Sequence, residues 1–267
     1  MPRTISIHDR AHLLEALGEH RAMHVYAIGD LDDFFFPFTS WFALEEGGRI
    51  RQIVLLYSAG AMPVVLAIAP RDPGEMGELM RSLLPVLPRR FYMHATPGVS
   101  EVLARDYELR PHGLHHKMEL VDPRRLDAVD TSGAVPLVGA DLPEIEAFYA
   151  AAYPGNWFDP RMLGTGRYVG ARVDGVLVSV AGVHVFSPTY RVAALGNIAT
   201  RGELRGRGLG AVVTASLCRA LARDCDTIGL NVHAENRGAI RLYERLGFAV
   251  CGSYEELEVV ARPLHEV

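Results

Sequence analysis

The chain has 267 residues, of which 49% are hydrophobic, and a formal net charge of −5 at pH 7. This balance excludes the basic stripe typical of nucleic-acid binders and of polybasic membrane anchors, and no apolar run approaches the ~20 residues of a membrane span. The N-terminal segment lacks the apolar core of a signal peptide, and three cysteines are too few for a disulfide framework. We therefore expect a cytoplasmic protein of one large or two ordinary domains, without a nucleic-acid, membrane or metal partner.

The first half alternates between helix and strand signals. Leucines at helical spacing predict a helix over residues 8–19, and methionines and leucines do the same over residues 73–86. Apolar runs bounded by glycine-containing turns predict strands. The other expected elements are strands at residues 41–45, 50–57, 63–69, 91–95 and 115–121 and a short helix at residues 99–105.

A polar segment separates the two halves. Residues 122–133 contain a proline and a glycine, and we predict a linker there between a domain of residues 1–121 and a domain of residues 134–267. After a first strand, Asp141 and Glu144 form an Asp variant of the capping box and predict the start of a helix.

The rest of the second half has clear boundaries. Asp174-Gly175, between two apolar runs, predicts a tight hairpin. Beyond the helix that starts near Asp141, the expected elements are a short helix at 160–163, strands at 134–138, 168–173, 176–186, 190–200, 227–232 and 255–260, and helices at 208–223 and 237–246.

A glycine-rich turn joins the strand that ends at Thr200 to the next helix. Its sequence is Arg205-Gly206-Arg207-Gly208-Leu209-Gly210. Glycines expose backbone N–H groups, and the helix N-terminus adds its dipole, so the turn predicts a site for a phosphate or pyrophosphate. The two arginines add positive charge with a geometry that matches phosphate oxygens.

The same turn also fits the glycine pattern of a dinucleotide-binding loop. Against that interpretation, the turn lies late in the chain, and the next strand lacks an acidic residue to bind a ribose hydroxyl. A dinucleotide binder therefore stays a third alternative.

A second motif follows from Asn236 to Phe248. Asn236 suits a helix N-cap, and Gly247 suits the left-handed position that ends a helix. Tyr243 lies seven residues after Asn236, about two turns along, so both can face one side of the helix.

Together, the two motifs resemble the signature of the GNAT N-acetyltransferase superfamily. That signature is R/Q-x-x-G-x-G/A, then a strand, then N-x-x-A-x-x-x-Y-x-x-x-G-F. The resemblance covers roughly residues 134–262, and the matching positions are Arg205, Gly208, Gly210, Asn236, Ala239, Tyr243, Gly247 and Phe248. It implies two GNAT-like α/β (α+β) domains, each a mixed, mostly antiparallel sheet flanked by helices, with a degenerate first domain that lacks both motifs.

The resemblance also implies a co-substrate, acetyl-CoA, and the residues that hold it. Its pyrophosphate would lie on the turn, and its pantetheine would run along the strand before the turn. The implied binding residues are Ile198, Ala199, Thr200, Arg205, Gly206, Arg207, Gly208, Leu209, Gly210, Asn236, Ala239 and Tyr243. The strands before and after the turn would splay apart to admit the acetyl group.

The implied reaction is transfer of the acetyl group to a primary amine by direct attack in a ternary complex. Tyr243 is the expected general acid for the leaving thiolate, and a backbone N–H at or beside Ile198 is the expected donor to the thioester oxygen. Several family members carry a glutamate as base where this chain has Ala194, so His184 and His233 are the candidate bases. A water chain, or an amine that arrives neutral, would need no side chain as base.

We therefore expect an acetyl-CoA-dependent N-acetyltransferase, an acyltransferase without a metal. Its acceptor would be a small-molecule amine, an amino acid or a peptide, and a homodimer is left open. The alternative of a different class is a non-catalytic acyl-CoA sensor or interaction module. The first half would shape the substrate site or stabilise the chain and would not bind a second coenzyme A.

Overall fold

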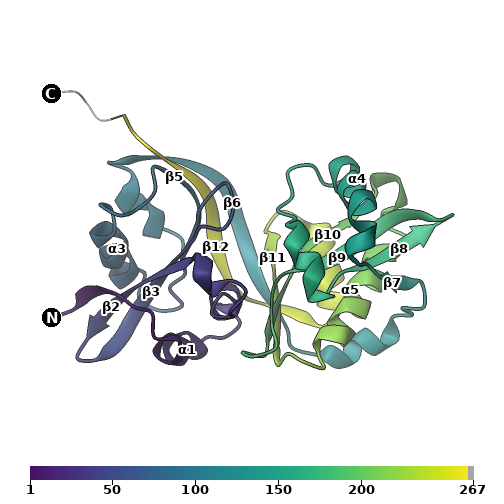
Figure 1. Ribbon diagram of the computed structural model, residues 1–267, viewed down its shortest axis with the longest axis horizontal. Coiled ribbons are helices and arrows are strands. Elements are labelled where there is room, and N and C mark those ends of the chain that lie inside the picture. The colour runs from purple at the N-terminus through teal and green to yellow at the C-terminus, as the bar shows by residue number, and fades with distance from the viewer. Residues whose placement is uncertain (264–267) are drawn as a thin grey trace. The chain divides into compact units, whose positions relative to one another are not determined.

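The computed structural model describes residues 1–263 and divides into two compact units. The first unit comprises Met1–Lys117, His233–Glu235 and the described residues from Cys251 onward, and the second comprises Met118–Val232 and Asn236–Val250. Both are mixed α/β units built on mostly antiparallel strands, which confirms the expected fold class (Figure 1). Within residues 1–263, no helix is both long and apolar enough to cross a bilayer.

The sheet of the first unit has the strand order β1-β2-β3-β4-β5-β12-β6. β4 and β5 are parallel, whereas β1–β2, β2–β3, β3–β4 and β5–β12 are antiparallel. The elements are β1 (Arg3–Ser6), α1 (Arg10–Gly18), α2 (Val25–Gly29), β2 (Thr39–Glu46), β3 (Arg49–Tyr57), β4 (Val64–Ala67), α3 (Pro73–Ser82), β5 (Arg90–Ala95), β6 (Tyr107–Leu120) and β12 (Phe248–Ala261).

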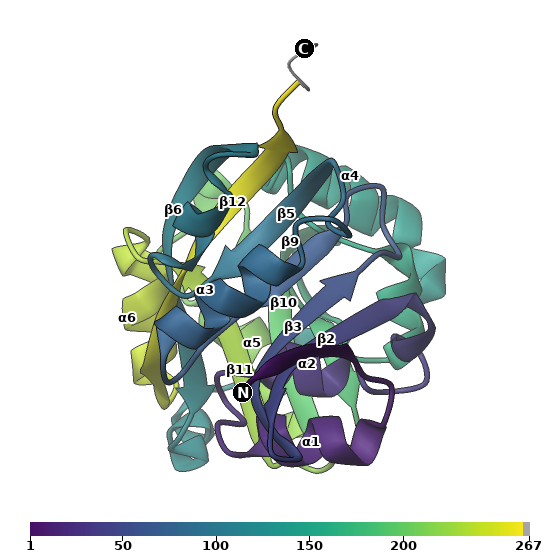
Figure 2. The same cartoon turned by 90° about the vertical axis from the view of Figure 1, so that its left-hand side faces the viewer.

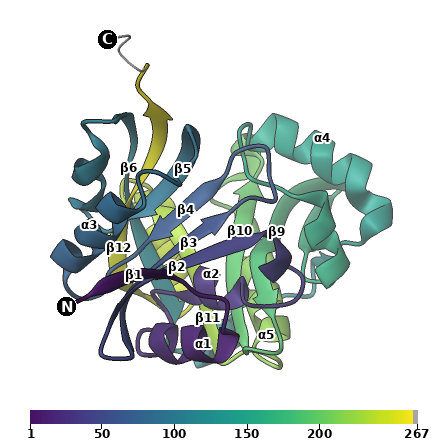
Figure 3. The same cartoon turned by 60° about the vertical axis from the view of Figure 1, so that its left-hand side comes forward.

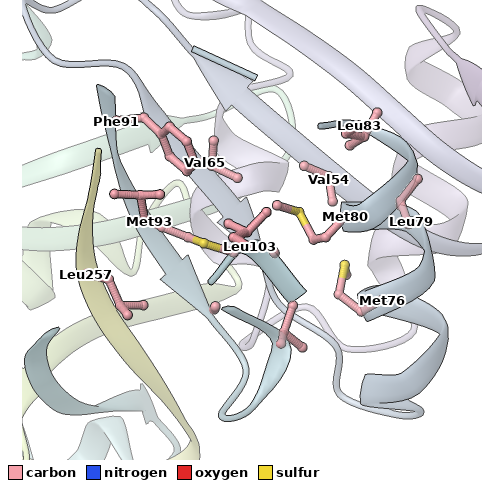
Figure 4. Close-up of a cluster of buried hydrophobic side chains, with 14 of the residues drawn as sticks. Val54, Val65, Met76, Leu79, Met80, Leu83, Phe91, Met93, Leu103 and Leu257 are labelled. Carbon is pink, nitrogen blue, oxygen red and sulfur yellow. The ribbon is translucent and has the colours of Figure 1, made fainter. Parts of the chain in front are cut away.

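Helix α3 lies over one face of this sheet (Figure 2). It has apolar residues at i, i+3, i+4 and i+7, the spacing that places side chains on one helical face. They are fully or almost fully buried against side chains from β3, β4, β5 and β12 (Figure 4). The labelled members of this core are Val54, Val65, Met76, Leu79, Met80, Leu83, Phe91, Met93, Leu103 and Leu257.

Several expected elements of the first unit differ in the structure. β1 and α2 were not predicted, because each has at most five residues and no clear periodicity. The helix expected at residues 99–105 is a 3₁₀ helix over Val99–Leu103. The strand expected at residues 115–121 is β6, which already begins at Tyr107.

The sheet of the second unit has the order β11-β10-β9-β8-β7. β10 and β11 are parallel, and the other neighbours are antiparallel. Helices α4 and α5 pack against these strands (Figure 3). The elements are β7 (Ala134–Pro136), α4 (Leu142–Ala152), β8 (Val169–Val173), β9 (Val176–Ser187), β10 (Val192–Thr200), α5 (Leu209–Leu221), β11 (Thr227–His233) and α6 (Arg237–Arg245).

The predicted hairpin is confirmed, and the predicted capping box is wrong. Asp174 and Gly175 have φ angles of 51° and 79°, the left-handed values required by a two-residue turn between β8 and β9. A 3₁₀ turn precedes α4, so the Asp141 carboxylate accepts a bond from the Val138 N–H instead of capping the helix. Glu144 accepts a bond from the Leu177 N–H, on β9.

Residues 122–133 are held against the second unit. They contain a 3₁₀ helix, Pro123–Ala128, whose Leu126 is buried. The Arg219 guanidinium, on α5, donates to the carbonyl oxygens of Leu126 and Val129 and to the Thr131 hydroxyl. This segment is therefore a packed part of the second unit.

Candidate active site

Strands β10 and β11 pair over only part of their length. The parallel register runs from Val192 opposite Thr227 to Leu195 opposite Leu230. Beyond Leu195, residues 196–200 of β10 have no partner residue on β11 within the described chain. The two strands therefore part toward the end of β10 that leads into the glycine-rich turn.

The point of parting coincides with a β-bulge in β10. On β9, the register passes from Gly182 opposite Gly196 to Val180 opposite Ala199, so two residues of β10 oppose the single residue Ala181. The first of these two, Asn197, has a φ angle of 53°, and asparagine is one of the few non-glycine residues that tolerate this left-handed value. The bulge removes Asn197 and Ile198 from the regular ladder.

Two aromatic hydroxyls hold the bulge. The Tyr149 hydroxyl, on α4, donates to the backbone carbonyl oxygen of Asn197 at 2.7 Å. The side-chain nitrogen of Asn197, Nδ2, donates to the Tyr168 hydroxyl at 3.5 Å. All three residues are buried. Burial raises the pKa of both Tyr149 and Tyr168, so both phenols keep their protons and remain donors.

His184 lies against the backbone next to the bulge. A Cβ atom on Gly196 would lie 1.9 Å from the Cδ2 atom of His184, so the imidazole occupies the space that a side chain would need there. His184 is itself the extra residue of a bulge in β9, between Val183 and Val185. Half-buried and fixed by packing, it is one of the two candidate bases.

The glycine-rich turn follows β10 and begins with a short 3₁₀ helix, Gly202–Leu204. Gly206 and Gly208 have φ angles of 78° and 83°, which only glycine adopts without strain. Gly208 is also the N-cap of α5 and has no side chain to bond the first turn. In the described chain, no oxygen accepts a hydrogen bond from the backbone N–H groups of residues 206–211.

The residues around the turn brace it. The Nε atom of Arg205 donates to the Thr200 carbonyl oxygen at 3.2 Å. A Cβ atom on Gly210 would contact Thr200 and Leu242 at 3.5 and 3.4 Å, so glycine brings the start of α5 close to β10 and α6. Arg207 and Leu209 complete the turn; Arg207 is exposed, and its charge adds to the dipole of the helix N-terminus.

This arrangement fits a pyrophosphate. Consecutive N–H groups without a protein acceptor, at the start of a helix of 13 residues, are typical of anion sites. The residues that would hold the group are the amides of the turn, with Ala199 and Thr200 at the end of β10 beside it. Bound acetyl-CoA would supply an acetyl group activated as a thioester.

Helix α6 carries the second motif. The Asn236 side chain caps the helix by accepting from the Ala239 N–H at 3.2 Å. Tyr243 is 7% exposed, and burial raises the pKa of its phenol. No hydrogen bond within the described residues involves this hydroxyl.

His233, the other candidate base, ends β11 but belongs to the first unit by its contacts. Its ring packs edge-on against His115, with 4.8 Å between the ring centroids. Its Nδ1 atom accepts a bond from the Glu235 N–H, and its Nε2 atom lies over Gly113. The other predicted site residues all lie in the second unit.

Tyr149, Tyr168 and Asn197 were not predicted as site residues. The glycine at position 196, isolated inside an apolar strand, was the available signal, because such a glycine often marks a bulge or a close approach. No local pattern links Asn197 to Tyr149, which lies 48 positions away.

Comparisons with known proteins identify relatives of the second half of the chain. The model of the acetyltransferase (GNAT) family matches residues 139–248. A mycothiol acetyltransferase from Acidimicrobium ferrooxidans is 36% identical over 111 residues, which are 40% of this chain and 33% of the relative. The match thus spans about a third of the length of that curated relative, and 34% of a second one from Tsukamurella paurometabola.

Solved structures are similar over most of the chain. One, described as a GNAT-family acetyltransferase from Novosphingobium aromaticivorans, has 26% sequence identity and a TM-score of 0.55 over 78% of this chain and 88% of that chain. A tandem GNAT protein from the clavulanic acid biosynthesis pathway has 18% identity and a TM-score of 0.56 over 99% of this chain and 100% of that chain. At 18% identity, the similarity to the tandem GNAT protein shows only that the two chains share a fold.

Proposed function

Because residues 139–248 form a domain of the acetyltransferase (GNAT) family, we propose that this chain transfers the acetyl group of acetyl-CoA to a primary amine. The observation that carries the proposal is the run of backbone N–H groups at residues 206–211 without protein acceptors. It lies directly after a strand whose last residues have left the ladder of β11. A phosphate site and an opened strand edge, adjacent in the chain, suit a cofactor with a diphosphate and an extended amide-bearing arm.

The reaction needs a donor to the thioester oxygen, an acid for the leaving sulfur and a neutral amine. In the proposed direct attack, the acceptor nitrogen bonds to the acetyl carbon as the carbon–sulfur bond breaks. The Ile198 N–H, within the bulge, is the proposed donor to the carbonyl oxygen. Tyr243 is the proposed acid, and its raised pKa keeps the phenol protonated and able to give a proton to the thiolate.

His184 is the proposed base in the second unit. Its position over Gly196 places it next to the bulge that carries the proposed oxygen donor. A neutral imidazole can take the proton that the amine loses as it attacks. His233 stays a second candidate, since its ring is held by His115 and the Glu235 N–H.

The start of α3 in the first unit is unfavourable for a second cofactor site. In that unit, the counterpart of the turn, between β4 and α3, carries Asp72 as N-cap, and this carboxylate accepts a bond from the Glu75 N–H. Two acidic groups at the start of α3 repel a phosphate where the second unit offers glycine amides. We propose that the first unit does not bind coenzyme A.

The acceptor is proposed to be a small-molecule amine, an amino acid or a peptide. The matched relatives, named mycothiol acetyltransferases, support a small molecule. The test is release of free thiol from acetyl-CoA on incubation of the full chain with a panel of amines, with mass spectrometry of the acetylated product. Thiol release with a matching product supports the proposal. Cofactor binding without turnover on any amine would favour the non-catalytic module, and stabilisation by NAD instead of acetyl-CoA would favour the dinucleotide binder.

A further inference from the structure

Tyr149 holds the peptide plane that carries the proposed oxygen donor. Its hydroxyl donates to the Asn197 carbonyl oxygen at 2.7 Å. That carbonyl and the Ile198 N–H belong to the same planar peptide group, and in a trans peptide the two bonds point in opposite directions. Fixing the carbonyl therefore fixes the direction of the N–H.

The register of the sheet leaves this peptide plane without an opposing residue on either side. Neither Asn197 nor Ile198 has a partner residue in the register of β9 or of β11. The left-handed φ angle of Asn197 is a conformation that costs energy in most residues and persists only when its surroundings impose it.

The support itself is rigid. Tyr149 is 2% exposed, and its ring packs against Phe158, whose ring in turn packs against Tyr168. The Tyr168 hydroxyl donates to the Val183 carbonyl oxygen and lies 3.5 Å from the side-chain nitrogen, Nδ2, of Asn197. A Cβ atom on Gly182 would lie 2.1 Å from the Tyr168 ring, so the strand leaves the ring no room to move toward it.

We propose that Tyr149 is a positioning residue for acetyl transfer: it orients and polarises the Asn197–Ile198 peptide so that the Ile198 N–H donates to the thioester oxygen. A hydrogen bond accepted by a carbonyl also strengthens the N–H of the same peptide as a donor, because hydrogen bonds in a chain polarise one another. The inference rests on the proposed function, and it goes beyond that function by naming the side chain on which the donor depends.

The test compares Tyr149→Phe with a control that also removes a buried hydroxyl from the second unit. Tyr149→Phe keeps the ring and removes only the hydroxyl. Ser187→Ala removes a hydroxyl that accepts from the Tyr190 N–H at the far end of β9, in the same unit but away from the bulge. Coenzyme A affinity by calorimetry, kcat at saturating acetyl-CoA and melting temperature are measured for both full-length variants and the wild type.

Tyr149→Phe is expected to lower kcat by about 10- to 100-fold, less than loss of a whole oxygen donor, which costs about 10²–10³-fold. Coenzyme A affinity should stay within about twofold, since the amides at residues 206–211 are unchanged. Ser187→Ala should keep the wild-type kcat, whatever its melting temperature. Wild-type kcat in Tyr149→Phe, or an equal loss of kcat in Ser187→Ala, would overturn the proposal.

A second readout does not depend on turnover. The amide ¹⁵N resonance of Ile198 reports directly on the peptide that Tyr149 binds, so it should shift in Tyr149→Phe and stay in place in Ser187→Ala. An unmoved Ile198 resonance would refute the proposal that Tyr149 orients the Asn197–Ile198 peptide, even if kcat fell. If the wild type transfers no acetyl group to any amine, the proposed function fails, and this resonance alone decides whether Tyr149 orients the peptide.

Asn197 gives a further check of the backbone geometry. Asn197→Gly can adopt the left-handed conformation freely, whereas a β-branched side chain opposes it. Asn197→Gly should therefore retain more turnover than Asn197→Val. The reverse order would contradict a role for the bulge.

Discussion

Gly182 and Gly196 face each other across β9 and β10, and an aromatic or imidazole ring lies where each would carry its Cβ atom. Tyr168 covers Gly182, and His184 covers Gly196. Because directly opposed residues of an antiparallel pair project to the same face of a sheet, the two rings lie on one face, beside the bulge at Asn197. The glycine pair thus explains how Tyr168 reaches the backbone of β9 and how His184 reaches the backbone of β10.

Gly196→Ala is expected to displace His184. The new methyl group would lie 1.9 Å from the imidazole Cδ2 atom, so either the ring or the strand must move. Forcing an extra carbon into a packed site typically costs about 1–3 kcal/mol. We expect a lower melting temperature and slower acetyl transfer, measured by thermal unfolding and thiol release. Gly139→Ala is the control, because a Cβ there meets no atom within 4 Å; equal effects of the two substitutions would refute the role of Gly196.

Gly206→Ala and Gly208→Ala are expected to weaken binding of coenzyme A. Neither new methyl group meets an atom within 4 Å, so the effect comes from the left-handed backbone, which costs about 1–2 kcal/mol per non-glycine residue. If the turn relaxes, its N–H groups lose their common direction, and affinity should fall by roughly 10-fold for this energy. Gly202→Ala, in the same loop but without a positive φ angle, should bind normally in a calorimetric titration. Normal binding by all three would contradict the assigned site.

Tyr243→Phe is expected to lower turnover without loss of cofactor binding. The hydroxyl has no hydrogen-bond partner within the described residues, so its removal should hardly change the melting temperature. General acid catalysis typically contributes about 10²–10⁴-fold, and the loss should appear in kcat. Steady-state kinetics beside a coenzyme A titration separate the two effects. Unchanged kcat would remove Tyr243 from the mechanism.

Lys117→Met is expected to stabilise the first unit near neutral pH. Lys117 is the chain's single lysine, is 3% exposed, and lies over the rings of Tyr26 and Tyr254. Burial lowers its pKa from 10.5 to about 8, so the folded state binds this proton less tightly than the unfolded state. The cost of the buried charge is present in full below about pH 8 and is relieved as the pH rises from about 8 toward 10.5.

Melting curves of wild type and Lys117→Met across that pH range check this sign. The gain in melting temperature should be largest at pH 7 and should shrink toward pH 10. A gain that grows with pH would show that the lysine is stabilising as a cation.

The local signals of the sequence proved reliable where one short segment decides the structure. Asp174-Gly175 predicted its hairpin, and Asn236 predicted its helix cap, because each depends on residues within a few positions. Asp141 failed as a cap since a 3₁₀ turn, which has no strong sequence pattern, redirects its carboxylate. At the bulge in β10, the Asn197 carbonyl accepts a hydrogen bond from Tyr149 on α4, and a contact over 48 positions leaves no trace in local periodicity.

The proposed function depends above all on binding of the coenzyme A diphosphate by the amides of residues 206–211. The most direct measurement is a titration of the ¹⁵N-labelled full chain with coenzyme A, followed by amide resonances. We expect the largest shifts at residues 206–211. If the resonances of these amides do not shift, or if the largest shifts occur at the start of α3 near Asp72, the proposed site is wrong.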